Sequence, residues 1–464
     1  MHFRNITLFF LFAMLLLSSC GKEESVPNPE GGGGGPSSEF VVPTVIPNGD
    51  ENYLTTNSDY IFDQEKLHTF KLIIPNSAYD RINNDPAAEI YVECMLVFEG
   101  DTISPVGVRY KGSIGAFVNC LSGNNVFNPS GSKTCTKLSM KVKINWKDRE
   151  ENFFKLKKLQ FHSMNNDPSQ MRERLGYHLF REMGVPGPRA VHARLVINDE
   201  FVGVFALVEQ VDNRFVKYNF DDDEGNLYKE VWPLTMDGFP QSNVTYLSAL
   251  KTNEDDNPSV EIIRNFAEQL STAGSSAVNA IVEEHMDIEK IISYAVVDRT
   301  IRHDDGPFHW YCSGGGCSSH NFFWYEEPTA KKLHLIPWDL DNAFENIQFD
   351  ANPVTPIADD WGETRNDCAP FSYGGFGLQQ WSAACDKLTQ SWTSYESVYC
   401  QKKQELIGNT MSESSTQTLL DTWENQIRTA TVEADARHDD AISVGTWQGA
   451  MDRLKDQLDF ARNN

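Results

Sequence analysis

The chain changes its hydrophobic period about halfway along, and this change constrains the fold more than any other feature. Residues 66–112 and 137–146 alternate apolar and polar side chains, which is typical of strands with one buried face. Residues 193–209 contain two more apolar runs around a short turn, which indicates a hairpin. From residue 258 onwards, apolar side chains recur mainly at helical spacing. This order predicts an α+β fold with a sheet-rich N-terminal part and a helical C-terminal part.

Several stretches carry the helical period. An early helix is expected over residues 168–183, with Ser169 as its N-cap and Gly184 at its end. The later helices are expected over residues 258–270, 277–302, 394–408, 412–436 and 446–462.

The composition is that of a globular protein with a strong acidic balance. Hydrophobic residues make up 40% of the 464 residues and charged residues 23%. There are 66 acidic side chains against 40 Lys and Arg, which gives a net charge of −26. Such a charge repels polyphosphate backbones, so we expect no nucleic-acid partner.

The N-terminus has the pattern of an export signal. Arg4 precedes an apolar run that is too short to span a bilayer comfortably. The run ends in Leu17-Ser18-Ser19-Cys20, which resembles the lipobox of bacterial lipoproteins. This resemblance implies that residues 1–19 are removed and that Cys20 is acylated, so that lipid alone anchors the protein.

The residues after Cys20 predict a surface tether. Residues 21–24 are similar to the surface-export signal of Bacteroidetes lipoproteins, which implies the outer membrane and the cell surface. Residues 20–42 are rich in Gly, Pro and Ser and predict a flexible linker. Residues 43–464 are then expected to form one domain.

Eight cysteines follow Cys20, and an even number in an exported chain is consistent with disulfides. The first pairs to expect are Cys120 with Cys135 and Cys312 with Cys317. The second pair lies between His309 and His320 at a spacing that also suits zinc. Both interpretations stay open, although an oxidising compartment and three intervening glycines favour the disulfide.

Three groups of polar residues can carry chemistry. Cationic side chains gather on neighbouring predicted strands, where they can hold phosphate oxygens or form an ordinary solvated face. A second group follows the long helix at residues 302–306 and continues at His320-Asn321. A third follows an apolar strand at Asp339 and Asp341. Carboxylates and an amide at such positions suit a hard cation such as Mg²⁺.

The order of these segments resembles the CotH kinase family. The matching pieces are Val108–Gly112, Lys137–Lys143, Met171–Leu175 with Gly184, Gly203–Phe205 with Glu209, Gly225–Lys229, Asp305-Gly306, His320-Asn321 and Pro337–Asp341. The resemblance implies a divergent protein-kinase-like fold, ATP with Mg²⁺ or Mn²⁺, and phosphate transfer to protein Ser or Thr.

The family pattern also implies roles for residues of the late segments. Asp305 matches the catalytic base, although Asp304 is an alternative. Asp339 matches the metal-binding aspartate, with Asp341 as a second ligand and Asn321 as a supporting one.

The early segments match the cofactor side of the family pattern. Among the lysines, Lys137 ranks first as the ATP-phosphate ligand and Lys141 second, with Glu173 as the residue that orients the lysine. Arg109, Lys111 and Glu209 complete the cofactor-binding candidates.

An alternative interpretation is a kinase-like surface module that has lost activity and binds protein or glycan. Trp361, Trp381 and Trp392 lie in or beside a Gly-rich polar stretch and are the aromatic side chains expected to be exposed for stacking on sugars.

Overall fold

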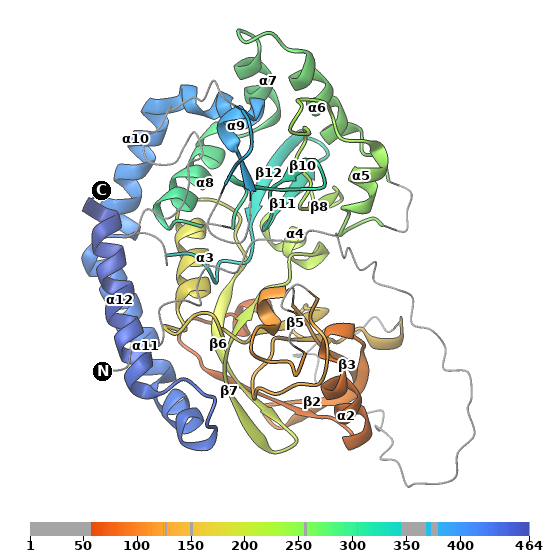
Figure 1. The fold of residues 1–464 in the computed structure, drawn as a ribbon, viewed down its shortest axis with the longest axis vertical. Coiled ribbons are helices and arrows are strands. Elements are labelled where there is room, and N and C mark those ends of the chain that lie inside the picture. Colours follow the sequence, from red (N-terminus) through yellow and green to blue (C-terminus); the bar gives the residue numbers. More distant parts are fainter. Residues whose placement is uncertain are drawn as a thin grey trace.

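The structure is a computed structural model that describes residues 57–344, 368–372 and 379–463. Short gaps interrupt this range at residues 113, 124, 126–127, 149–151, 255–257 and 304. The described chain has a sheet-rich part followed by a mainly helical part, as the sequence predicts (Figure 1). The expected signal segment, the acylated Cys20 and the linker lie outside the described residues. Within the described chain, no helix is long and apolar enough to cross a membrane.

The sheet-rich part is a closed barrel in the order β1-β2-β3-β4-β5-β7-β6. Strands β1 and β6 close the barrel in parallel, and the other neighbours are antiparallel. Aromatic and branched side chains such as Phe70, Val106, Phe161 and Phe205 fill its core. The strands are β1 (His68–Ile73), β2 (Val92–Phe98), β3 (Asp101–Tyr110), β4 (Met140–Lys143), β5 (Lys158–His162), β6 (Ala190–Ile197) and β7 (Glu200–Val208).

A second, smaller sheet in the order β12-β11-β8 lies in the helical part. It contains β8 (Leu227–Lys229), β11 (Phe322–Glu327) and β12 (Lys332–Pro337). A third sheet in the order β10-β9-β14-β13 packs nearby, formed by β9 (His309–Ser313), β10 (Gly316–Ser318), β13 (Phe371–Ser372) and β14 (Gln379–Ser382).

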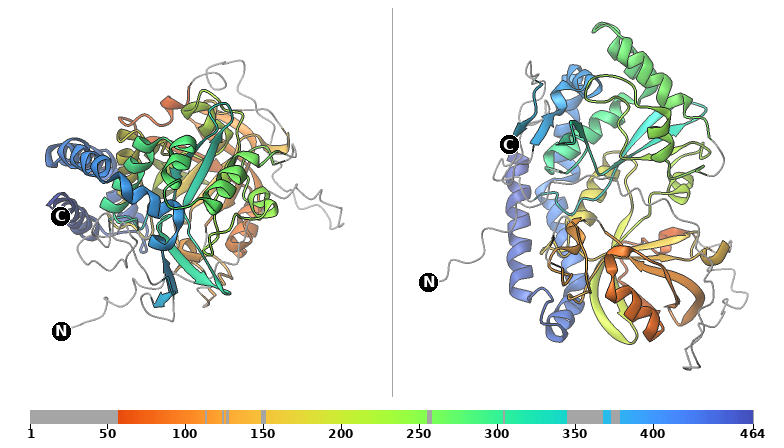
Figure 2. Two further views of the ribbon diagram at one scale, coloured as in Figure 1. Left: turned by 90° about the horizontal axis from the view of Figure 1, so that it is seen from above. Right: turned by 45° about the vertical axis from the view of Figure 1, so that its right-hand side comes forward.

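Helices surround these sheets and extend along the barrel (Figures 1 and 2). They are α2 (Asn76–Asn84), α3 (Arg172–Glu182), α4 (Asn213–Asn219), α5 (Asn243–Ser248), α6 (Glu261–Thr272), α7 (Val278–His285), α8 (Ile288–Thr300), α9 (Lys387–Trp392), α10 (Glu396–Glu405), α11 (Glu413–Arg437) and α12 (Val444–Asn463). In Figure 1, α11 and α12 run beside α3 and the barrel strands β6 and β7, so the C-terminal helices join both parts of the chain.

The helix boundaries correct two details of the sequence analysis. The helix expected over residues 277–302 is two helices, because Asp287 caps a new helix by accepting the backbone N–H of Lys290. The early helix begins at Arg172 rather than beside Ser169. The carboxylate of Asp167 accepts the backbone N–H of Arg172 at 2.8 Å and therefore does the capping work expected of Ser169.

The disulfides resolve the open cysteine question. Cys120 is bonded to Cys135 and Cys312 to Cys317, which confirms both expected pairs, and Cys368 is bonded to Cys385. The zinc interpretation is wrong, because both thiolates that it required are bonded to each other.

The aromatic core corrects the expectation of exposed tryptophans. Trp392 is fully buried and packs against Trp232, while Trp381 is 3% exposed and packs against Trp310. Neither side chain presents a face to solvent. Trp361 lies outside the described residues.

The segment Gly225–Lys229 explains one of the sequence motifs in physical terms. A Cβ atom on Gly225 would lie 1.9 Å from the backbone oxygen of Glu326, so only glycine fits. Next to it, the Asn226 amide donates to the Glu326 carboxylate at 2.6 Å and to the hydroxyl of Tyr228 at 3.0 Å. Burial raises the pKa of Glu326 to about 7. This motif therefore fixes β8 against β11.

We predict that Gly225→Ala lowers the stability of the protein by about 3 kcal/mol, because a backbone atom blocks the new methyl group. The matched control is Gly449→Ala, which lies in α12 with no atom within 4 Å of the new Cβ and should gain up to about 1 kcal/mol. The melting temperatures of the two oxidised variants should therefore move in opposite directions. Equal shifts would contradict the close approach of the two strands.

Candidate functional site

The candidate site begins where β3 leaves the barrel. Lys111 follows β3 directly, and its backbone N–H donates to the oxygen of Ser139 at 2.9 Å, which fixes its main chain. Its ammonium group lies 2.6 Å from Nε2 of His162, the last residue of β5. The side chain of Lys111 thus turns from the barrel towards α3.

Glu173 in the first turn of α3 holds the other side of the imidazole. Nδ1 of His162 lies 2.8 Å and 3.0 Å from the two carboxylate oxygens of Glu173. Both side chains are buried. Burial, and then the charge of Lys111, lowers the pKa of His162 well below its usual value, so the ring is neutral.

Asp339 approaches the same place from the end of β12. Its backbone N–H donates to the hydroxyl of Tyr177 on α3 at 2.9 Å, and its carbonyl accepts from Nε2 of His303 at 3.1 Å. The preceding residue, Trp338, has its ring centroid 5.6 Å from the ammonium of Lys111. Contacts from α3 and from the chain after α8 therefore position Asp339.

The charges at this junction influence one another. Burial lowers the pKa of Lys111 to about 8, against the opposing effect of Asp339 and Glu173. Burial, and then the charges of Asp339 and Glu173, raises the pKa of Asp341 well above its usual value. We call Lys111, His162, Glu173, Asp339 and Asp341 the junction cluster.

Asp305 and Asn321 meet beside this cluster. The Asn321 amide donates to the Asp305 carboxylate at 2.8 Å, and the backbone oxygen of Asn321 accepts from the N–H of Trp338 at 3.1 Å. The residues between them form the β9–β10 hairpin, which the Cys312–Cys317 disulfide closes. The hairpin brings two residues together that are 16 positions apart. Asp304, the alternative base, lies outside the described residues.

Three polar residues at one edge of the β12-β11-β8 sheet have left-handed backbones. Glu230, Asn321 and Asp339 have φ angles of 55°, 57° and 55°. Glu230 donates its N–H to Phe322, the neighbour of Asn321, so these positions are close along the edge. Such conformations cost about 1–3 kcal/mol each in a residue other than glycine, and they concentrate at functional sites.

The structure places the candidate cations of the early segments in different surroundings. Lys137, the first choice, lies with its ammonium 5.1 Å from the ring of Phe205, and burial lowers its pKa to about 8. Lys141 of β4 lies opposite Arg109 on the adjacent strand β3, and Arg109 forms an ion pair with Glu89. Lys111 is the lysine of this group that sits beside the Glu173–His162 pair.

Glu209 has a structural partner. Its carboxylate accepts from the guanidinium and the backbone N–H of Arg189, at 3.0 Å and 3.1 Å. Both side chains are buried, so this ion pair accounts for the residue as part of the fold.

The donor atoms fit a hard cation that arrives with phosphate. Among the described residues, no three His, Cys, Asp or Glu side chains converge on one point. Mg²⁺ usually takes only one or two carboxylates and completes its shell with phosphate oxygens and water. Asp339 and Asp341 could supply such a pair. Burial, and then the charges of Asp339 and Glu173, raises the pKa of Asp341, and a bound cation would oppose this rise.

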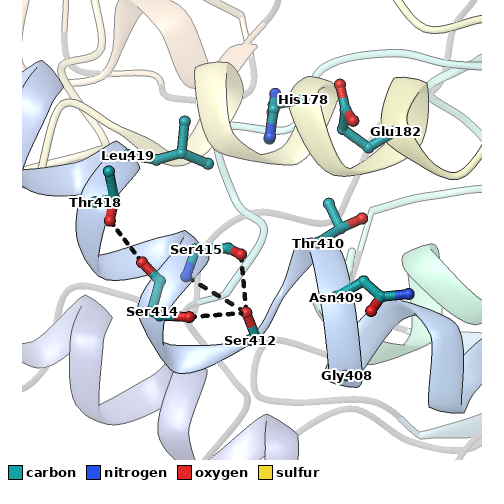
Figure 3. Close-up of a pocket in the computed structure, with 10 residues that line it drawn as sticks. All are labelled: His178, Glu182, Gly408, Asn409, Thr410, Ser412, Ser414, Ser415, Thr418 and Leu419. Atoms are coloured by element: carbon teal, nitrogen blue, oxygen red, sulfur yellow. Dashed lines mark hydrogen bonds between the residues drawn. The ribbon is translucent and has the colours of Figure 1, made fainter.

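A cavity of about 770 Å³ lies on another part of α3. Figure 3 shows His178 and Glu182 of α3 across from hydroxyl groups at the start of α11, including those of Ser412 and Ser415. None of the junction cluster lines it. The convergence of charged groups rather than cavity size therefore identifies the candidate site.

Sequence analysis missed His162 and Tyr177. His162 ends a short strand that the alternation did not reveal, and Tyr177 lies one turn after Glu173 within the expected helix. The available signal was a histidine directly after Leu159-Gln160-Phe161, a short stretch with apolar side chains at alternate positions.

The comparisons with known proteins show the family of the chain. The CotH kinase protein family model matches residues 108–463, a range that contains the junction cluster, Asp305 and Asn321. Inner spore coat protein H of Bacillus subtilis (strain 168) is 23% identical over 185 residues, which are 38% of this chain. The match spans 46% of that relative's length. The chain belongs to the CotH kinase family.

Proposed function

We propose that the protein transfers the γ-phosphate of ATP to Ser or Thr of a protein substrate, with Mg²⁺ or Mn²⁺ as the metal. The observation that carries this proposal is the junction cluster, in which His162 links Lys111 to Glu173 of α3 and the charge of Asp339 acts on both Lys111 and Asp341. Phosphoryl transfer depends mainly on such positioning and charge stabilisation. We further propose a divergent kinase-like arrangement, with the barrel and α3 on the nucleotide side and the helical part on the acceptor side.

The residues divide the work as follows. Lys111 binds phosphate oxygens, because its ammonium group uses one hydrogen bond on His162 and has two more N–H donors. Asp339 and Asp341 hold the divalent cation, which when bound neutralises charge on the phosphates. Trp338 covers the ammonium of Lys111 and connects the lysine side of the site to Asp339.

Asp305 accepts the proton of the attacking hydroxyl group. The amide of Asn321 donates to one carboxylate oxygen of Asp305 and so orients the carboxylate. His303, two residues before Asp305, binds the backbone carbonyl of Asp339. This contact holds the proposed base and the proposed metal-binding aspartate close together. This geometry supports Asp305 as the base.

We propose that the enzyme is exported and held at the outer membrane by lipid on Cys20, facing the cell surface. Three disulfides support export, because such bonds persist mainly in oxidising compartments. Its partner is then a protein substrate outside the cytoplasm. The alternative of an inactive glycan-binding module is weakened by the burial of Trp381 and Trp392.

The proposal predicts nucleotide binding. ATP with Mg²⁺ or Mn²⁺ should raise the melting temperature of the oxidised protein, and a ligand at 100 times its Kd adds about 2.7 kcal/mol. Asp339→Asn should abolish the metal-dependent part of the shift, because it removes a ligand charge. Asp452→Asn on the exposed face of α12 is the matched control and should behave like the wild type. A shift that survives in Asp339→Asn would contradict the assignment.

The next prediction separates chemistry from binding. Asp305→Asn should lower phosphate transfer from radiolabelled ATP to casein, used as a generic Ser/Thr acceptor, by about 10²–10⁴-fold. Its Kd for ATP should stay within about threefold of the wild type, because Asp305 faces the acceptor. An equal loss of ATP binding would show that Asp305 serves the nucleotide site instead.

A further inference from the structure

We propose that His162 is a positioning residue. By bridging Lys111 and Glu173, it makes the position of the lysine ammonium group depend on the position of α3. The inference rests on the proposed function, because it takes Lys111 as the ligand of the nucleotide phosphates. It goes further by assigning a role to His162. A lysine and a glutamate can form a direct ion pair, whereas here a neutral imidazole connects the two.

The hydrogen bonds use both ring nitrogens, one towards each element. Nε2 faces Lys111 at 2.6 Å, and Nδ1 faces Glu173 at 2.8 Å and 3.0 Å. A lysine ammonium has no acceptor, so it must donate to Nε2. Nε2 therefore carries no proton in the neutral ring, and Nδ1–H donates to Glu173.

The surroundings keep the ring neutral. The charged groups that influence it are Lys111 and Asp339, together with Glu173, which it contacts directly. The ring is buried, and protonation would place a second cation against Lys111. The Nδ1–H form is thus the one form that satisfies both neighbours at once.

The ring is also fixed by packing. It ends β5 and meets the ring of Trp338 edge to face, with 5.8 Å between centroids and an interplanar angle of 89°. Trp338 directly precedes Asp339. His162 therefore contacts the barrel, α3 through Glu173, and the strand end that presents Asp339. A movement of the barrel strand, of α3 or of this strand end would therefore change the position of the Lys111 ammonium group.

The first experiment needs no nucleotide and so tests the bridge apart from the proposed function. The ring of His162 is observed by ¹⁵N NMR of histidine-labelled protein, with its signals identified by their loss in His162→Phe. We expect the neutral Nδ1–H form to persist from pH 8 to pH 5, and Glu173→Gln to disturb it. An imidazole that titrates near its ordinary pKa, or that carries its proton on Nε2, would overturn the proposal.

The second experiment measures ATP binding and kinetics. His162→Phe keeps a flat ring but removes both nitrogens, and we expect a loss of about 10–100-fold in kcat/KM for ATP. His162→Gln has one acceptor and one donor and should recover most of that loss. The control is His438→Phe, a histidine that instead binds the backbone of Phe201 and should stay near the wild-type value.

These variants also separate the two levels of the argument. Wild-type affinity and kcat/KM in His162→Phe would overturn the positioning role even if the NMR form is as expected. Equal losses in His162→Phe and His162→Gln at unchanged melting temperature would also overturn it. Absence of ATP binding in the wild type would instead refute the proposed function. The NMR experiment would then still show whether His162 bridges Lys111 and Glu173, but the bridge would not position a nucleotide ligand.

Discussion

Burial of charge where the barrel meets α3 is the constraint on which the site depends. Moving a carboxylate or an ammonium out of water costs several kcal/mol unless partners compensate. Glu173, Asp167 and Arg172 are each at most 3% exposed. Glu173 is compensated by His162, while Asp167 accepts backbone N–H groups at the start of α3 and lies 3.5 Å from Arg172. The helix therefore cannot move away from the barrel without removing the partner of the buried Glu173 carboxyl group.

The sequence predicted the local parts of the fold well. The alternation around β1 and β2 is a property of consecutive residues, because one face of each strand lies in the barrel core. Helices α11 and α12 follow from long apolar stripes in the same way. The parallel closure of β1 on β6 joins residues more than 100 positions apart, and no local period carries that information. The break before α8 was missed because the apolar stripe continues through the cap at Asp287.

Motif order anticipated some neighbours in the structure. Asp305 follows α8, Asn321 directly precedes β11, and Asp339 follows β12. The structure brings Asn321 to Asp305 and to Trp338, the residue before Asp339. The sequence could not reveal which lysine lies beside α3. Lys111 and Lys141 lie on the same face of neighbouring strands, and alternation does not show which strand end faces the helix. His162 escaped notice because its contribution is two directed hydrogen bonds rather than a charge. Such a role depends on neighbours that only the folded chain brings together.

The C-terminal helices complete this arrangement by holding both sides of the junction. Gln426 of α11 accepts from Arg174 of α3 at 2.7 Å, while Glu433 of the same helix binds Arg194 of the barrel at 2.7 Å. From α12, the indole of Trp447 donates to the backbone of Ser169, just before α3. Helix α11 thus contacts both α3, which carries Glu173, and the barrel, from which Lys111 extends. Movement of α3 against the barrel would break these contacts as well as the imidazole bridge. The lysine is therefore set in place by the fold before any ligand arrives. For the phosphate ligand that we propose, this preorganisation lowers the entropy cost of binding.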